Sequence, residues 1–83
     1  MQSMSLLEIP RTAMKLHALI SDLRWRVQLL GSDIQDEEKR TGISNVSNTA
    51  YPILARNLRT RRGNLLATIT MLESQLAETD MAA

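Results

Sequence analysis

The stretch Ile9–Ile34, IPRTAMKLHALISDLRWRVQLLGSDI, decides the fold of this chain. Its aliphatic residues recur at alternating steps of four and three, the spacing of a helix packed lengthwise against another helix. A strand would instead alternate every two residues. The stretch therefore predicts one long helix with an apolar seam, whose members are Ile9, Ala13, Leu16, Ile20, Leu23, Val27, Leu30 and Ile34.

The second half of the chain repeats this pattern. Its seam is interrupted by Arg61 and Arg62, with Gly63 directly after them, and comprises Tyr51, Leu54 or Ala55, Leu58, Leu65, Ile69, Leu72 and Leu76. Two helices of similar length that a short connector joins must run antiparallel. The predicted fold class is all-α: an antiparallel, coiled-coil-like two-helix hairpin that forms a four-helix bundle by homodimerisation.

The residues between and around the seams place the boundaries of this single domain, residues 1–83. Pro10 suits a helix start and Gly42 a helix end, whereas Asn48 or Thr49 suits the N-cap of the second helix. The predicted segments are a loose arm at 1–9, a helix at 10–40, a connector at 41–48, a helix at 49–79 and a frayed tail at 80–83.

Two internal glycines leave open whether each helix bends or breaks. The first seam continues in phase from Leu30 to Ile34 across Gly31, which favours one continuous helix there. Gly63, followed by Asn64 as a potential cap, allows a break in the second helix.

Composition excludes several classes of function. The 83 residues include no cysteine and one histidine, His17, so a disulfide, a thiolate zinc site and a histidine-rich metal site are all excluded within one chain. No catalytic, nucleotide-binding or cofactor motif is present, and we expect no enzyme activity, no cofactor and no metal. We also expect a cytoplasmic protein with no membrane segment, since no signal peptide or apolar run of spanning length is evident.

Trp25 is the most informative exception to the seam pattern. It falls on the far side of the first helix, and Met14, Ala18 and Leu29 share that side. An apolar strip exposed on a small rod is typical of a contact surface, and tryptophan is enriched at interface centres. We therefore predict an interface through this outer stripe together with Met71, although a lone tryptophan covered by arginine stems is the alternative. The simplest partner is a second copy of the chain.

Arginines gather halfway along the predicted rod, although the net charge is only +1. We term them the basic belt: Arg24, Arg26, Arg56, Arg59, Arg61 and Arg62. Three interpretations are open: a solvated face with ion pairs such as Asp22–Arg26, a docking face for an acidic helix, or a contact to nucleic-acid phosphates. We expect Asp33 to pair with Arg56 or Arg59. Arg62 falls on the seam, where it needs a carboxylate, a partner chain or a route to solvent.

These patterns favour a non-enzymatic interaction or assembly protein, such as an adaptor, a co-chaperone or a regulatory subunit. Its partner would be a second copy, or another protein with an apolar or acidic helix. The alternative is a nucleic-acid-binding helical dimer that uses the basic belt, and salt sensitivity would separate the two hypotheses.

Overall fold

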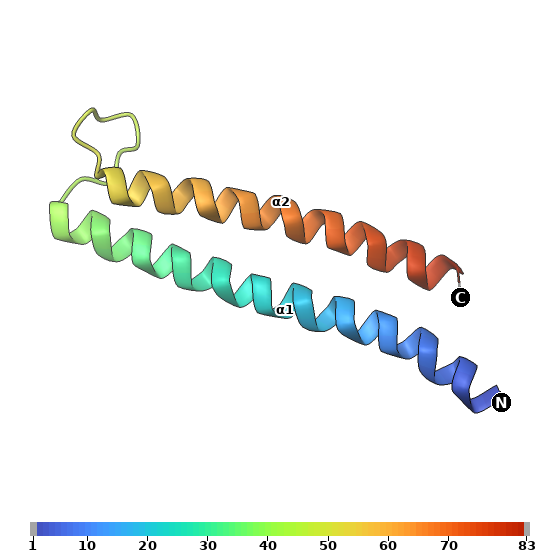
Figure 1. The fold of residues 1–83 in the computed structure, drawn as a ribbon. Helices are drawn as coiled ribbons and strands as arrows, with labels where there is room; N and C mark the ends of the chain where they lie inside the picture. The colour runs from blue at the N-terminus through green and yellow to red at the C-terminus, as the bar shows by residue number, and fades with distance from the viewer. Residues whose placement is uncertain (1, 83) are drawn as a thin grey trace.

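The computed structural model describes residues 2–82, with side chains for residues 11–79. It consists of two antiparallel helices, α1 (Gln2–Thr41) and α2 (Ile53–Ala82), that pack against each other (Figure 1). Both ends of the chain lie at one end of the hairpin and the connector lies at the other. The described part of the chain contains no strand, which confirms the prediction of an all-helical hairpin.

The hairpin is a rod of 62 × 17 × 12 Å with a radius of gyration of 18.4 Å. A compact domain of this length would have a radius of gyration of about 12 Å. The described residues therefore form an extended rod and not a closed globular core, with α1 and α2 packed on each other.

The predicted seams form the contact between the helices. Ile34 is the most deeply buried large side chain, at 2% exposure, and the fully buried Ala55 rather than Leu54 takes the seam position near the start of α2. The buried residues are Ile20, Leu23, Leu30, Ile34, Tyr51, Ala55, Ile69 and Leu72. Each large aliphatic member contributes about 1.5–3 kcal/mol through burial.

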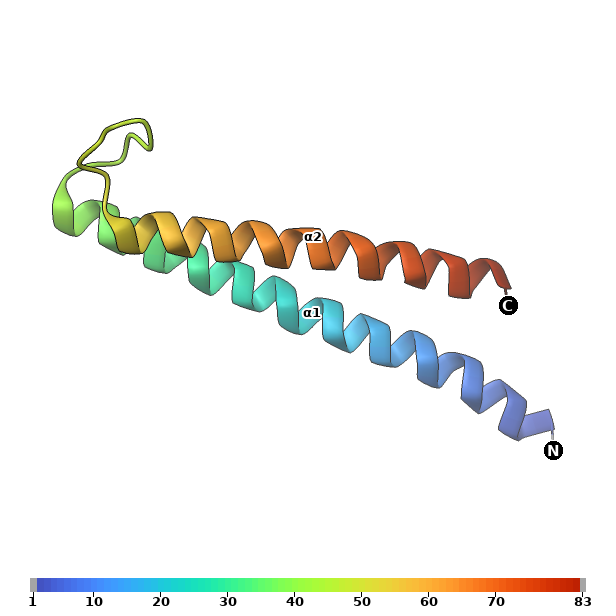
Figure 2. The ribbon, with the colours of Figure 1, turned by 45° about the horizontal axis from the view of Figure 1, so that its top comes forward.

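A hydrophobic cluster lies in the half of the rod nearer the chain ends, where α1 residues Ile20 and Leu23 pack with Ile69 and Leu72 of α2. Half-buried Leu16, Val27, Leu65 and Leu76 pack around them. Beyond this cluster the helices diverge toward their free ends, as both ribbon views show (Figure 2).

α1 begins earlier than the sequence analysis placed it. The helix already starts at Gln2 and passes through Pro10, where we expected the arm at 1–9 to end. Residues 2–9 are mostly Met, Leu, Glu and Gln, which favour helix. Pro10 removes one N–H donor from the ladder without ending it. Residue 1 lies outside the described residues.

The end of α1 confirms the role predicted for Gly42. Its φ is +74°, the left-handed conformation that glycine adopts without a Cβ penalty, and its N–H donates to the Glu38 carbonyl at 2.8 Å. The helix thus ends at Thr41, one residue later than expected.

α2 begins later than predicted, at Ile53 instead of residue 49. Asn48 does cap a turn, because its side-chain oxygen accepts from the Ala50 N–H at 2.8 Å and its carbonyl accepts from the Tyr51 N–H at 3.0 Å. A residue that precedes proline avoids helical dihedrals, so Tyr51 before Pro52 stops this turn from growing into the helix. The Pro52 carbonyl accepts the first helical bond, from the Arg56 N–H at 3.0 Å.

α2 also ends later than predicted, because it continues to Ala82 through most of the segment expected to fray. Residue 83 lies outside the described residues. Both internal glycines are helical, so α1 continues through Gly31 and α2 continues through Gly63 without a break.

Candidate interaction surface

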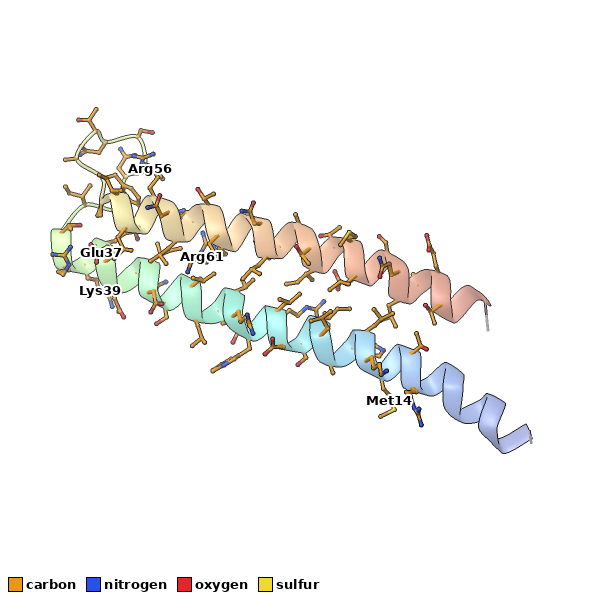
Figure 3. All side chains as sticks on the ribbon, in the orientation of Figure 1. Met14, Glu37, Lys39, Arg56 and Arg61 are labelled. Carbon is orange, nitrogen blue, oxygen red and sulfur yellow. The ribbon has the colours of Figure 1, made fainter. Side chains whose placement is uncertain are left out.

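The outer stripe stays uncovered in the hairpin. Met14 is 68% and Trp25 is 58% exposed, and Leu29 and Met71 expose about half of their surfaces. Ala18 is exposed as well. Met14 points away from α2 (Figure 3). No side chain among residues 11–79 therefore covers them.

The two flanks of α1, on either side of the buried seam, differ in character. One flank, which we term the polar flank, has an open hollow lined mostly by polar side chains together with Ile20 and Trp25. The residues around it are His17, Ile20, Ser21, Arg24, Trp25 and Gln28. This flank therefore combines hydrogen-bonding groups with the apolar surfaces of Ile20 and Trp25.

The opposite flank has a smaller and more apolar hollow of about 290 Å³, which we term the leucine groove. It lies between the helices and is lined by Arg26, Leu29, Leu30, Arg61 and Leu65. Leu19 and Leu54 lie seven residues before Arg26 and Arg61, so they continue the same flank along each helix. Both are about half exposed. The leucine groove is thus the centre of an apolar face that both helices build.

The basic belt does not form one continuous positive surface. Arg24 pairs with Glu73 across the helices, and Arg26 pairs with Asp22 four residues earlier at 3.1 Å, as predicted. Arg59 pairs with Glu38 at 3.0 Å instead of with Asp33, so the predicted Asp33 pair is wrong. Half of the six belt arginines therefore already have a carboxylate within the chain.

Arg56 also lacks the predicted pair with Asp33. Its guanidinium donates to the Val46 carbonyl at 3.3 Å and lies over the Tyr51 ring at 5.4 Å from the centroid. Asp33 follows Arg26 by seven residues and so lies on the other flank of the hairpin from Arg56 and its neighbour Arg59, whereas the folded connector brings Val46 close. Arg56 thus holds the connector against the start of α2.

Arg61 and Arg62 have no hydrogen bond or ion pair to any described residue. Arg62 is half-buried, and its Nη1 lies 3.6 Å from the position that a Cβ on Gly31 would take. The guanidinium therefore lies beside Gly31 of α1, and its charge contributes to lowering the pKa of the Glu38 carboxyl. A cation on the seam is tolerated in this way, and Arg61 remains the exposed, unpaired arginine beside the leucine groove.

A polar cluster near the connector was not predicted from the sequence. The Tyr51 hydroxyl, on a residue only 3% exposed, donates to Glu38 at 2.8 Å and accepts from the Arg59 Nε at 2.7 Å. Arg59 also lies over the Tyr51 ring. The hydrogen bonds from Arg59 and Tyr51 lower the pKa of the Glu38 carboxyl, and the bonds that Arg59 donates to Tyr51 and Glu38 raise the pKa of its guanidinium. The cluster ties the last turns of α1 to the first turns of α2.

A second, simpler pair lies one residue before Glu38. Arg40 pairs with Glu37 within α1, which lowers the pKa of the Glu37 carboxyl and raises that of Arg40. Glu37 and Glu38 are thus both paired with arginines, although their position in the sequence is typical of a solvated acidic helix end. The acidic groups without a described interaction are Asp33 and Asp36 on α1 and Glu78 on α2.

No arrangement for metal or nucleophilic chemistry emerges from the described residues. They contain no group of three histidine or carboxylate side chains that could hold a metal ion. His17 is exposed on the polar flank. Neither α1 nor α2, as far as each is described, offers an apolar run of the length that a lipid bilayer requires. Comparison with protein-family models, with curated proteins and with solved structures finds no match.

Proposed function

We propose that this chain is a small non-enzymatic interaction or assembly module that acts by offering a helical surface to other helices. The observation that carries this proposal is the exposure of large apolar side chains along both helices. The most exposed are Met14, Trp25, Ile53, Leu54 and Met71, each with more than half of its surface accessible. Exposed apolar surface of this kind is characteristic of contact sites.

The first occupant of this surface is a second copy, which gives a four-helix bundle of two hairpins. A two-layer rod buries few side chains for its length, and small chains without disulfides or metals gain stability by assembling. A two-fold symmetric dimer uses one patch twice, so a single apolar face on the hairpin is enough.

The cellular role would be that of an adaptor, a co-chaperone or a regulatory subunit. Such proteins bind by burying the apolar anchors of one helix in the groove of another, and charged rims set the orientation. The alternative of nucleic-acid binding has less support. Arg24, Arg26 and Arg59 are engaged with carboxylates, and Arg56 is engaged with the connector.

Unfolding at different protein concentrations tests the proposal. If assembly stabilises the fold, the urea midpoint monitored by circular dichroism rises with chain concentration, because mass action favours the assembled native state. A hundredfold change in concentration shifts the stability of a dimer by about 2.7 kcal/mol per mole of dimer. A midpoint that stays the same over that range would contradict self-association.

A further inference from the structure

The leucine groove has a charge pattern that a single chain leaves incomplete. Two arginines, Arg26 on α1 and Arg61 on α2, line the same hollow beside Leu29 and Leu65. Arg61 has no partner among the described residues, and Arg26 has only the exposed Asp22 of its own helix. Two like charges beside one apolar groove favour an occupant that brings carboxylates.

The chain itself carries a matching carboxylate on the same flank. Asp33 follows Arg26 by seven residues, which places both on one side of α1, roughly 10 Å apart along the axis. Asp33 is exposed and has no interaction with any described residue. One flank of α1 therefore carries a cation, Arg26, and an anion, Asp33, with Leu29 near the midpoint between them.

We propose that a second copy of the chain covers the leucine groove in the antiparallel orientation, so that each Asp33 meets Arg26 and Arg61 of the other copy. This inference rests on the proposed self-association and specifies its face and register. The two-fold axis is perpendicular to α1 and passes it between Leu29 and Leu30. It therefore places Arg26 of one copy at the same height along the rod as Asp33 of the other. The groove is then a site that only the second copy completes, by supplying the carboxylates.

The same charges exclude the parallel orientation. In a parallel two-fold dimer each α1 would lie over the other copy's α2 at the same level. Arg26 of one copy would then face Arg61 of the other on both sides of the axis. Like charges brought together at an interface cost several kcal/mol, so the pattern selects the antiparallel register.

The apolar residues fit this register as well. Leu29 lies beside the axis and therefore meets its own counterpart, which forms the apolar centre of the contact. Arg61 lies at the level of Arg26, and Leu54 lies one heptad before it on α2. The two-fold rotation therefore places each Leu54 against the aliphatic stem of the other copy's Arg61.

Charge reversal with complementation tests the proposal on the full chain. Asp33→Arg alone sets three cations together at each site, and the double variant Arg26→Asp/Arg61→Asp sets three anions together. We expect each variant to weaken self-association by about tenfold or more. An equimolar mixture restores every pair, so native mass spectrometry should show the mixed dimer in preference to either homodimer.

A chain that carries all three substitutions should form a homodimer again, and it provides a readout even if a separate variant folds poorly. Gln35→Arg, which adds a cation to the polar flank of α1, should leave the dimer intact. Self-association that is unchanged by Asp33→Arg would overturn the register while the proposed function stands. A wild-type chain that stays monomeric would overturn both the register and the proposed self-association.

Discussion

The Tyr51 hydroxyl donates a 2.8 Å hydrogen bond to the Glu38 carboxylate, and this bond joins the end of α1 to the residue that precedes Pro52. Tyr51→Phe keeps the buried ring and removes the hydroxyl, which leaves Glu38 and Arg59 each with one bond fewer. We expect the free energy of unfolding to fall by about 1–2 kcal/mol. Urea unfolding measures it.

Thr60→Val is the matched control for that substitution. The Thr60 hydroxyl is exposed and donates to the Arg56 carbonyl of its own helix at 3.2 Å. Its loss should change stability by less than about 0.5 kcal/mol. Equal effects of the two substitutions would show that the cluster at Tyr51 does not tie the helices together.

The depressed pKa of Glu38 predicts a loss of stability in acid. The folded chain binds this proton less readily than the unfolded chain, so the contribution is complete above the ordinary carboxyl pKa of 4.5. It disappears as the pH falls through the lower value of the folded state. The difference in unfolding free energy between wild type and Glu38→Gln should therefore be constant from about pH 7 to about pH 5 and shrink below pH 4.5.

The comparison with Glu38→Gln separates this carboxyl from its neighbour. Glu37 also has a lowered pKa, caused by Arg40, but it is present in both proteins, and its contribution cancels in the difference. A difference that does not vary with pH would mean that Arg59 and Tyr51 stabilise a neutral side chain equally well.

Alanine substitutions at a buried and at an exposed isoleucine compare the seam with the outer surface. Ile34 is 2% exposed and Ile53 is 76% exposed. Ile34→Ala should lower the free energy of unfolding by about 2–5 kcal/mol, because it leaves a cavity between the helices. Ile53→Ala should change it by less than about 0.5 kcal/mol. If the alanine at 53 were the more damaging one, Ile53 would be covered in the assembled protein.

Glycines 42 and 63 should respond to alanine in opposite directions. Gly63 lies inside α2 with no atom within 4 Å of an added Cβ, so Gly63→Ala should raise stability by about 0.5–1 kcal/mol. Gly42 has a positive φ, so Gly42→Ala should lower stability by about 1–2 kcal/mol. Thermal unfolding measures both, and two shifts of the same sign would contradict the described helix ends.

The seam spacing was sufficient to predict the hairpin, its antiparallel direction and nearly all of its buried residues. Helix boundaries were harder to predict because they depend on competing local effects. The Asn48 cap looked like a helix start, but the restriction that Pro52 places on Tyr51 moved the start to Ile53.

Pairing between side chains was the least predictable feature. Glu38, and not Asp33, pairs with Arg59. The pairing depends on which flank of α1 lies beside Arg59, and Glu38 lies on that flank. The seam pattern alone does not separate the polar flank of α1 from the leucine groove. The difference becomes visible only in the structure, where both helices line the leucine groove, through residues such as Arg26 and Arg61, whereas α1 alone lines the hollow on the other flank.

The exposed outer residues were correctly predicted to lie outside the seam, and their role as an interface stays a prediction. Sedimentation equilibrium of the unmodified chain tests it most directly. We expect a mass of twice the 9.3 kDa chain at micromolar concentrations, with dissociation on dilution. A mass of one chain at every concentration would contradict the claim that this hairpin needs a second copy.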